Sequence, residues 1–240
     1  MTGTERETLV ERRAAVLATI ERACARAGRD PASVTLVAVS KTVPADDLVA
    51  AVAAGLDRLG ENRVQEGVAK APLVAGATWE LVGPLQSNKA RRAVETFTRI
   101  QSVDSVQLAE RLDRIAGELE RAAPLAVLLQ VNVDDDAAKA GFDLADLARD
   151  LPTILHLPNL RVEGLMTIGR LTTEPEDARS TFRSLRELAA RLRDAQPSLG
   201  PELSMGMSQD YAVAVEEGAT IVRVGRALFG ARPAGAEPRC

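Results

Sequence analysis

Two periodicities of hydrophobic positions alternate along the chain. In residues 7–27 apolar side chains recur at helical spacing, and Gly28 and Pro31 end this segment. Residues 34–39 then form a β-branched apolar run that is too short for a helix and apolar on both faces. Strands of parallel sheets have this composition because helices cover both of their faces. The first forty residues therefore predict a helix followed by a buried parallel strand.

The same alternation continues to the end of the chain. Further strands are expected at residues 58–60, 79–83, 99–103, 125–133, 161–166, 202–205 and 221–225. Further helices are expected at residues 46–54, 62–69, 87–97, 105–122, 144–151, 176–195 and 208–217. Eight strands separated by helices, with no linker, predict an α/β fold consisting of a single (β/α)8 TIM barrel. We expect this domain to span residues 1–231, followed by a flexible tail at residues 232–240. The second and seventh strands are short and weakly apolar, which leaves a doubly wound open sheet as the alternative.

Composition restricts the class of partner. A chain of 240 residues with 46% hydrophobic residues can bury one substantial core. Its net charge of -4 and its 2% aromatic content argue against nucleic acid, which needs a basic field and stacking platforms. No apolar run is long enough to span a bilayer, so we expect a cytoplasmic protein without a membrane partner. Cys24, Cys240 and the lone His156 form no metal-ligand or acid/base pattern, so neither a metal site nor a catalytic histidine is expected.

Lys41 directly follows the first predicted strand. In a barrel the active site is assembled at the carboxyl ends of the strands, so a lysine here would point into the barrel mouth. Partial desolvation there lowers the pKa of an amine and favours the neutral form that condenses with aldehydes. The alternative is a solvated lysine that begins a loop before Pro44.

The loops after the seventh and eighth strands predict a phosphate site. In barrels these two loops recurrently bind phosphate through backbone N–H groups and glycines. Ser204 and Ser208 can add hydroxyl donors, and Gly225 and Arg226 can add backbone amides. Alternatively, Ser208 only caps the following helix and Gly225 only relieves crowding. The motifs indicate a phosphate ligand and leave its identity open.

Arg223 and Asn62 are the remaining candidates. Arg223 lies within the eighth strand, where a buried guanidinium needs a partner; it could face a pyridine nitrogen or pair with Glu61 or Glu163. Asn62 ends the second strand, next to the strand that presents Lys41. It could donate a hydrogen bond to a ring hydroxyl or cap the next helix.

Six segments in this order resemble the pyridoxal phosphate homeostasis proteins. They read LVAVSKT at 36–42, GENRVQE at 60–66, GPLQSNK at 83–89, GLM at 164–166, SMGMS at 204–208 and VRVG at 222–225. The resemblance covers nearly the whole chain. It implies the barrel of the N-terminal domain of alanine racemase, the type III fold of pyridoxal phosphate proteins.

The resemblance also implies what the site binds. Pyridoxal 5'-phosphate would be held as an internal aldimine (a Schiff base) on Lys41, with Asn62 near the ring and Arg223 towards the pyridine nitrogen. Its phosphate would lie at the four residues Ser204, Ser208, Gly225 and Arg226. An arginine keeps the ring nitrogen unprotonated and makes the ring a weak electron sink, which suits storage of the cofactor. The family further implies a role in vitamin B6 homeostasis, with apo-enzymes that use this cofactor as partners.

Two departures from the family pattern stand out. Glu80 and Pro84 lie where the family often carries histidines, and Arg226 replaces a small hydroxyl residue. Two other functions stay open. An amino-acid racemase would use Lys41 as one base and an unidentified second group, although the chain ends soon after the eighth strand and its only tyrosine, Tyr211, begins a barrel helix. An aldolase would use Lys41 without a cofactor. We expect a monomer, since no continuous exposed apolar stripe is evident, and a binding protein rather than an enzyme.

Overall fold

Eight parallel strands close into a barrel in chain order. The computed structural model describes residues 3–136, 138–169 and 174–230. The strands are β1 (Thr35–Val39), β2 (Arg58–Glu61), β3 (Thr78–Leu81), β4 (Arg99–Val103), β5 (Leu125–Gln130), β6 (Leu160–Met166), β7 (Glu202–Ser204) and β8 (Ile221–Val224). β8 pairs with β1 over four residues of each strand and closes the barrel. The predicted barrel is therefore confirmed, and the open sheet is wrong. The predicted tail at residues 232–240 lies outside the described residues.

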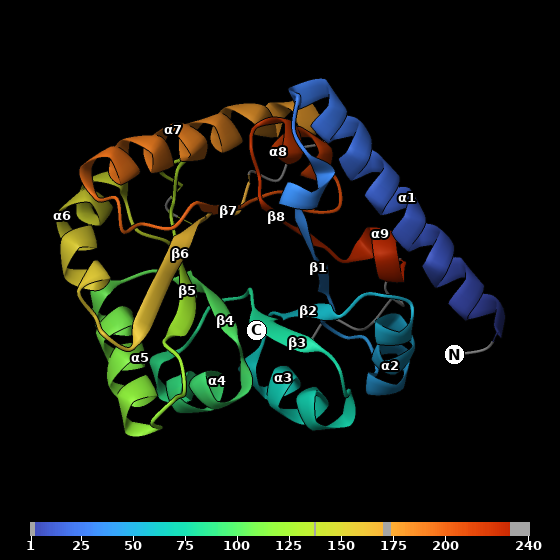
Figure 1. Ribbon diagram of the computed structural model, residues 1–240, viewed down its shortest axis with the longest axis horizontal. Coiled ribbons are helices and arrows are strands. Elements are labelled where there is room, and N and C mark those ends of the chain that lie inside the picture. Colours follow the sequence, from blue (N-terminus) through green and yellow to red (C-terminus); the bar gives the residue numbers. More distant parts are fainter. Residues whose placement is uncertain (1–2, 137, 170–173, 231–240) are drawn as a thin grey trace.

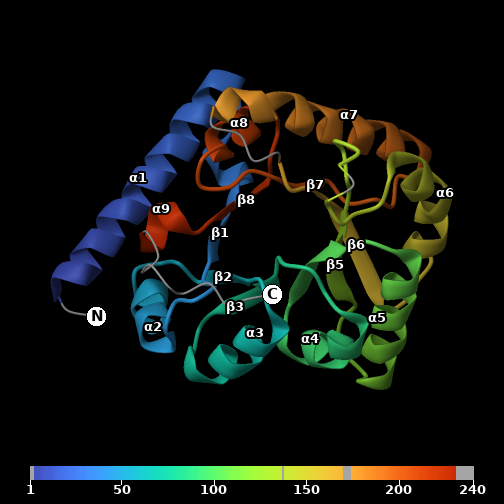
Figure 2. The same ribbon diagram turned by 180° about the vertical axis from the view of Figure 1, so that it is seen from behind.

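Helices surround the strands on the outside (Figures 1 and 2). They are α1 (Gly3–Ala27), α2 (Ala45–Ala53), α3 (Val64–Lys70), α4 (Ala90–Thr96), α5 (Val106–Glu118), α6 (Leu144–Leu155), α7 (Arg179–Ala195), α8 (Tyr211–Glu216) and α9 (Arg226–Phe229). Short 3-10 turns precede α4 at Ser87–Lys89 and α7 at Pro175–Ala178, within segments predicted as single helices. The long α1 packs against α8 and α9, so it covers the side of the barrel where the chain closes on itself.

Several predicted boundaries differ from the observed ones. The helix expected to end at residue 151 continues through Pro152 to Leu155, because Leu151 and Ile154 are both buried against the barrel. The strand expected to reach residue 133 ends at Gln130, where Val131 makes only an isolated bridge to Phe142. The short helix α9 was not predicted at all. Cys24 is buried in α1, and His156 lies exposed at the end of α6.

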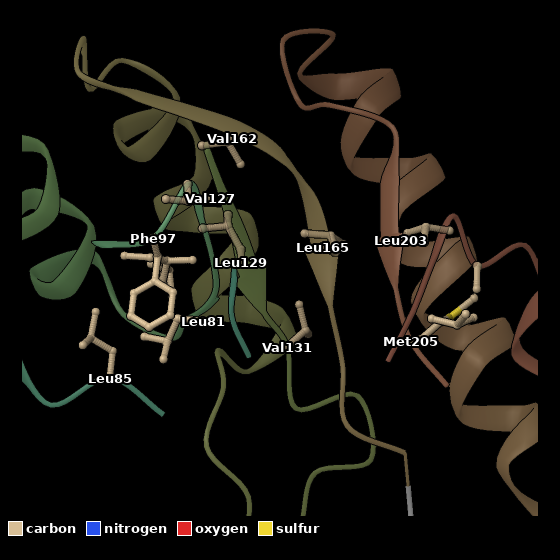
Figure 3. Close-up of a cluster of buried hydrophobic side chains, with 14 of the residues drawn as sticks. Leu81, Leu85, Phe97, Val127, Leu129, Val131, Val162, Leu165, Leu203 and Met205 are labelled. Atoms are coloured by element: carbon tan, nitrogen blue, oxygen red, sulfur yellow. The ribbon is translucent and has the colours of Figure 1, made fainter. Parts of the chain in front are cut away.

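The buried side chains form two layers. The larger layer lies between strands and helices, and Figure 3 shows ten of its labelled members, among them Leu81, Leu129 and Leu203. A smaller cluster fills the inside of the barrel and contains Val37, Val82, Leu128, Met166 and Ile221. Since side chains of a strand alternate between its faces, Val37 and Val39 point inward on β1. Lys41 follows two residues after Val39, in the turn beyond the carboxyl end of β1.

Candidate functional site

The carboxyl ends of β8, β1 and β2 bring the candidate residues to one mouth of the barrel. Val37 lies opposite Arg223 in the β1–β8 pair, and Val39 lies opposite Gly60 in the β1–β2 pair. Lys41 follows Val39 by two residues and Asn62 follows Gly60 by two, so both lie just beyond the carboxyl ends of their strands, as does Gly225 after β8. Lys41 is half-buried, and its direction into the barrel mouth stays a prediction.

A cluster of charged side chains lies behind Lys41 and was missed in the sequence. We define the Lys70 cluster as Ser40, Glu61, Glu66 and Lys70. The Nζ atom of Lys70 donates to Glu61 Oε1 at 2.7 Å and to Glu66 Oε2 at 3.2 Å, and Ser40 Oγ donates to Glu61 Oε1 at 2.8 Å. Burial raises the pKa of Glu61, against the opposing effect of the hydrogen bonds from Lys70 and Ser40. Burial also acts to raise the pKa of Glu66, but hydrogen bonds from Thr42 N–H and Lys70 prevail and lower it.

The loops after β7 and β8 meet at the hydroxyl of Ser208. Its Oγ accepts hydrogen bonds from Gly225 N–H at 3.2 Å and from Ala227 N–H at 3.4 Å. Ser208 does not cap α8, because the helix begins at Tyr211 and Asp210 holds the cap position. Two backbone donors therefore converge on one oxygen atom, which is the arrangement that an anion's oxygen requires.

Gly206 shapes the first of these two loops. Its φ of 89° lies in the left-handed region, and a Cβ there would lie 2.5 Å from the Cβ of Ala214. Only glycine fits this bend without moving α8. The side chain of Arg226 is exposed on the first turn of α9.

Arg223 is buried inside the barrel, with 4% of its surface exposed. Its Nη1 donates to Ser204 Oγ at 2.6 Å and its Nη2 donates to the carbonyl oxygen of Thr167 at 2.8 Å. Both acceptors are neutral. Burial lowers the pKa of Arg223 to about 10, although the charge of Asp210 works in the opposite direction. The alternative that Arg223 pairs with Glu61 or Glu163 is wrong, because those carboxylates bind Lys70 and Arg99.

Comparison with known proteins identifies the family. The model of the alanine racemase N-terminal domain matches residues 13–233. A pyridoxal phosphate homeostasis protein of Pseudomonas aeruginosa is 46% identical over 234 residues, which cover 95% of this chain and 98% of the relative. The chain belongs to the pyridoxal phosphate homeostasis protein family.

Solved structures agree with this family and with the fold. PipY of Synechococcus elongatus, in a structure with pyridoxal phosphate bound, is 46% identical with a TM-score of 0.77, over 88% of this chain and 100% of PipY. The alanine racemase of Clostridium difficile is only 16% identical, with a TM-score of 0.65, over 85% of this chain and 54% of the racemase. This second likeness concerns the fold alone, and it confirms the predicted barrel of the alanine racemase type.

Glu80, which departs from the family pattern, belongs to an interior polar network that ends at Arg223. We define this network as Glu80, Arg99, Gln101, Ser204 and Arg223. Gln101 Nε2 donates to Glu80 Oε2 at 2.6 Å, and Ser204 Oγ donates to Gln101 Oε1 at 2.6 Å. Arg99 Nη1 donates to Glu80 Oε1 at 3.1 Å. The carboxylate of Glu80 therefore fixes the orientation of the Gln101 amide. Because the Ser204 hydroxyl donates its hydrogen to Gln101, its oxygen is the acceptor for Arg223.

The structure separates the residues predicted to bind phosphate into two groups. Ser208 and Gly225 lie together at the loops, whereas Ser204 is fully buried below them and hydrogen-bonded to Arg223 and Gln101. A direct contact of Ser204 with phosphate stays a prediction.

Asn62 sits at the β2 end, where the chain passes very close to Gly83. A Cβ on Gly83 would lie 2.3 Å from the carbonyl oxygen of Asn62, so the family segment beginning at Gly83 needs glycine for this approach. Asn62 is not the cap of α3, because Arg63 holds that position and makes no side-chain cap hydrogen bond. Its proposed contact with a ring hydroxyl stays a prediction.

Two further observations concern the described part of the chain. In residues 3–136, 138–169 and 174–230, none of the helices is both long and apolar enough to cross a membrane. Within the same residues, histidine, cysteine and acidic side chains nowhere gather in threes with the spacing of a metal site.

Proposed function

We propose that this protein binds pyridoxal 5'-phosphate at the mouth of its barrel and acts as a carrier of the cofactor. The observation that carries the proposal is the grouping of three donor types at one mouth. These are the amine of Lys41, the buried guanidinium of Arg223 and the two amides that converge on Ser208.

The donor set fits the chemistry of this ligand. When bound, pyridoxal phosphate supplies an aldehyde that condenses with a primary amine and releases water. Lys41 is the amine that would hold the aldehyde carbon. Ser208 and the amides of Gly225, Arg226 and Ala227 would hold the phosphate, and Asn62 would orient the ring.

Arg223 suits a carrier better than an enzyme. A fully buried guanidinium held by neutral oxygens retains its protons at neutral pH, so it can donate to a ring nitrogen but cannot accept a proton from it. A ring whose nitrogen stays unprotonated withdraws electrons weakly, which suits storage or transfer of the cofactor better than broad amino-acid chemistry. Ser204 would act on the ligand through Arg223, because its hydroxyl oxygen accepts from Nη1.

The carried cofactor would pass to apo-enzymes that use it. We propose that the barrel domain of residues 1–231 performs this role as a monomer in the cytoplasm, without nucleic acid or membrane as a partner. The relatives named pyridoxal phosphate homeostasis proteins support the assignment, as does PipY with the cofactor bound.

Two measurements on the loaded protein test carrier against enzyme. A carrier restores the activity of a cofactor-free enzyme and leaves the α-proton of alanine unexchanged in deuterium oxide. Exchange of that proton at a rate well above the rate with free pyridoxal phosphate would favour the racemase instead. If the protein does not bind pyridoxal phosphate at all, both the carrier and the racemase are excluded. That result would favour a cofactor-independent aldolase.

A further inference from the structure

The residue that follows Lys41 has a strained backbone. Thr42 has a φ of 66°, in the left-handed region. A β-branched side chain rarely adopts this conformation, because its Cβ substituents crowd the backbone. Strained residues of this kind persist only where surrounding contacts hold them, and they often lie at functional sites.

The segment is held by a turn hydrogen bond, from Val43 N–H to the carbonyl oxygen of Ser40 at 3.0 Å, and by contacts from the Lys70 cluster. Thr42 N–H donates to Glu66 Oε2 at 3.1 Å, and Lys70 Nζ donates to the carbonyl oxygen of Ser40 at 3.0 Å. The backbone is therefore held on both sides of Lys41, by two side chains that stand one helical turn apart on α3. The hydroxyl of Ser40, which donates to Glu61, adds a third contact.

Lys70 is fully used in this cluster. An ammonium group has three N–H donors, and those of Lys70 are directed at Ser40 O, Glu61 Oε1 and Glu66 Oε2. Its side chain is 13% exposed and that of Glu61 is 0% exposed. Charge-assisted hydrogen bonds shielded from water in this way are stronger and more directional than surface ion pairs. The cluster is thus suited to hold a strained turn.

We infer that Glu66 and Lys70 are positioning residues, which keep Thr42 in its left-handed conformation so that Lys41 points into the barrel mouth. This inference rests on the proposed role of Lys41. Without the two contacts, Thr42 relaxes to negative φ and the chain leaves β1 in a different direction. The amine of Lys41 then no longer faces the site that Arg223 and Ser208 border.

Glu66 and Thr42 together provide a test by rescue. Glu66→Ala removes the acceptor, and Glu66→Gln keeps an oxygen in its place. In the double variant Thr42→Gly/Glu66→Ala, glycine adopts a φ of 66° without strain, so the turn no longer needs the contact. Glu118→Ala is the matched control, since Glu118 forms an exposed ion pair with Arg114 one turn away on α5.

The first readout is the rate at which each variant captures added pyridoxal phosphate, followed by stopped-flow absorbance. We expect Glu66→Ala and Lys70→Met to slow capture by about tenfold or more, since a misplaced reactive group costs at least this much. Glu66→Gln and Thr42→Gly/Glu66→Ala should recover most of the rate. The Glu118→Ala control should match the wild type.

The second readout needs no cofactor. Amide hydrogen exchange of Thr42 in the unloaded protein should become faster in Glu66→Ala, while the amides of β5 and β6 keep their protection. If Glu66→Ala and Lys70→Met capture the cofactor at the wild-type rate, or if glycine at position 42 fails to rescue Glu66→Ala, the inference is wrong. A wild-type protein that captures nothing would instead refute the role of Lys41 itself.

Discussion

Arg223 Nη1 lies 2.6 Å from the hydroxyl oxygen of Ser204, deep inside the barrel. This contact connects the candidate binding site to the interior polar network, which continues through Gln101 to Glu80. The guanidinium is thereby fixed in position by neutral acceptors, and its positive charge is left for a ligand at the mouth.

The first prediction concerns Arg223. Arg223→Met removes the charge and both donors but keeps an apolar stem of similar length. Because a hydrogen bond from a charged group contributes roughly 1.5–3 kcal/mol, affinity for pyridoxal phosphate should fall by about tenfold to a hundredfold. Equilibrium titration followed by absorbance measures this loss. An unchanged affinity would show that Arg223 only fills the barrel.

Gln101 provides a prediction about stability. Gln101→Leu removes the amide that donates to Glu80 Oε2 and the oxygen that accepts from the Ser204 hydroxyl, while Arg99 still donates to Glu80 and Arg223 to Ser204. An unsatisfied buried polar group costs about 1–3 kcal/mol, so the free energy of unfolding should fall by at least this amount. Urea denaturation measures it, with the exposed Gln107→Leu on α5 as the control. Equal stability of the two variants would contradict the proposed order of donors and acceptors in the network.

Ser208 allows the phosphate site to be separated from the rest. Ser208→Ala removes the oxygen on which the amides of Gly225 and Ala227 converge. We expect it to weaken binding of pyridoxal phosphate by up to about tenfold, the worth of one hydrogen bond, while binding of pyridoxal, which lacks the phosphate, stays the same. Parallel titrations with the two ligands decide the point. Equal losses for both would move Ser208 away from the phosphate.

Glu61 should make stability depend on pH. Its pKa is raised by burial above the ordinary value of 4.5, so the folded protein keeps this proton at pH values where the unfolded chain has lost it. The stability contributed by Glu61 is therefore fully present below pH 4.5 and is lost as the pH rises through the raised pKa.

Glu61→Gln does not titrate and isolates this effect. Relative to that variant, the wild type should lose free energy of unfolding as the pH rises from 4.5 through the raised pKa of Glu61. Urea denaturation at several pH values gives the difference between the two proteins. If the wild type instead gains free energy of unfolding relative to Glu61→Gln as the pH rises, the pKa of Glu61 is lowered in the folded state.

The sequence predicted the barrel because each strand and helix has its own hydrophobic period. The sequence was also enough to select three candidate site residues, Lys41, Arg223 and Gly225. Each lies at or near the carboxyl end of a predicted strand, where barrels assemble their sites. Side chains alternate between the two faces of a strand. Because Leu203 on β7 packs outward against the helices, this alternation also places the neighbouring Ser204 inside the barrel.

The Lys70 cluster was missed for a physical reason. Glu66 and Lys70 stand four residues apart on a short helix, and such a pair normally lies on a solvated face. Only the tertiary structure brings them against β1, where they hold the residues on both sides of Lys41. Glu61, at the end of a buried strand, was the one signal in the sequence that this face is not exposed.

The central claim is that Lys41 holds pyridoxal phosphate covalently, and one measurement tests it most directly. The protein is loaded with pyridoxal phosphate, reduced with borohydride and digested, and the modified lysine is found by mass spectrometry. The chain has four lysines, Lys41, Lys70, Lys89 and Lys139, so the assignment is unambiguous. We predict that the label is on Lys41 and that the near-visible absorption band bleaches on reduction. Lys41→Ala should show neither the band nor the label, whereas Lys89→Ala should show both. A label on another lysine, or a band that survives in Lys41→Ala, would contradict the account.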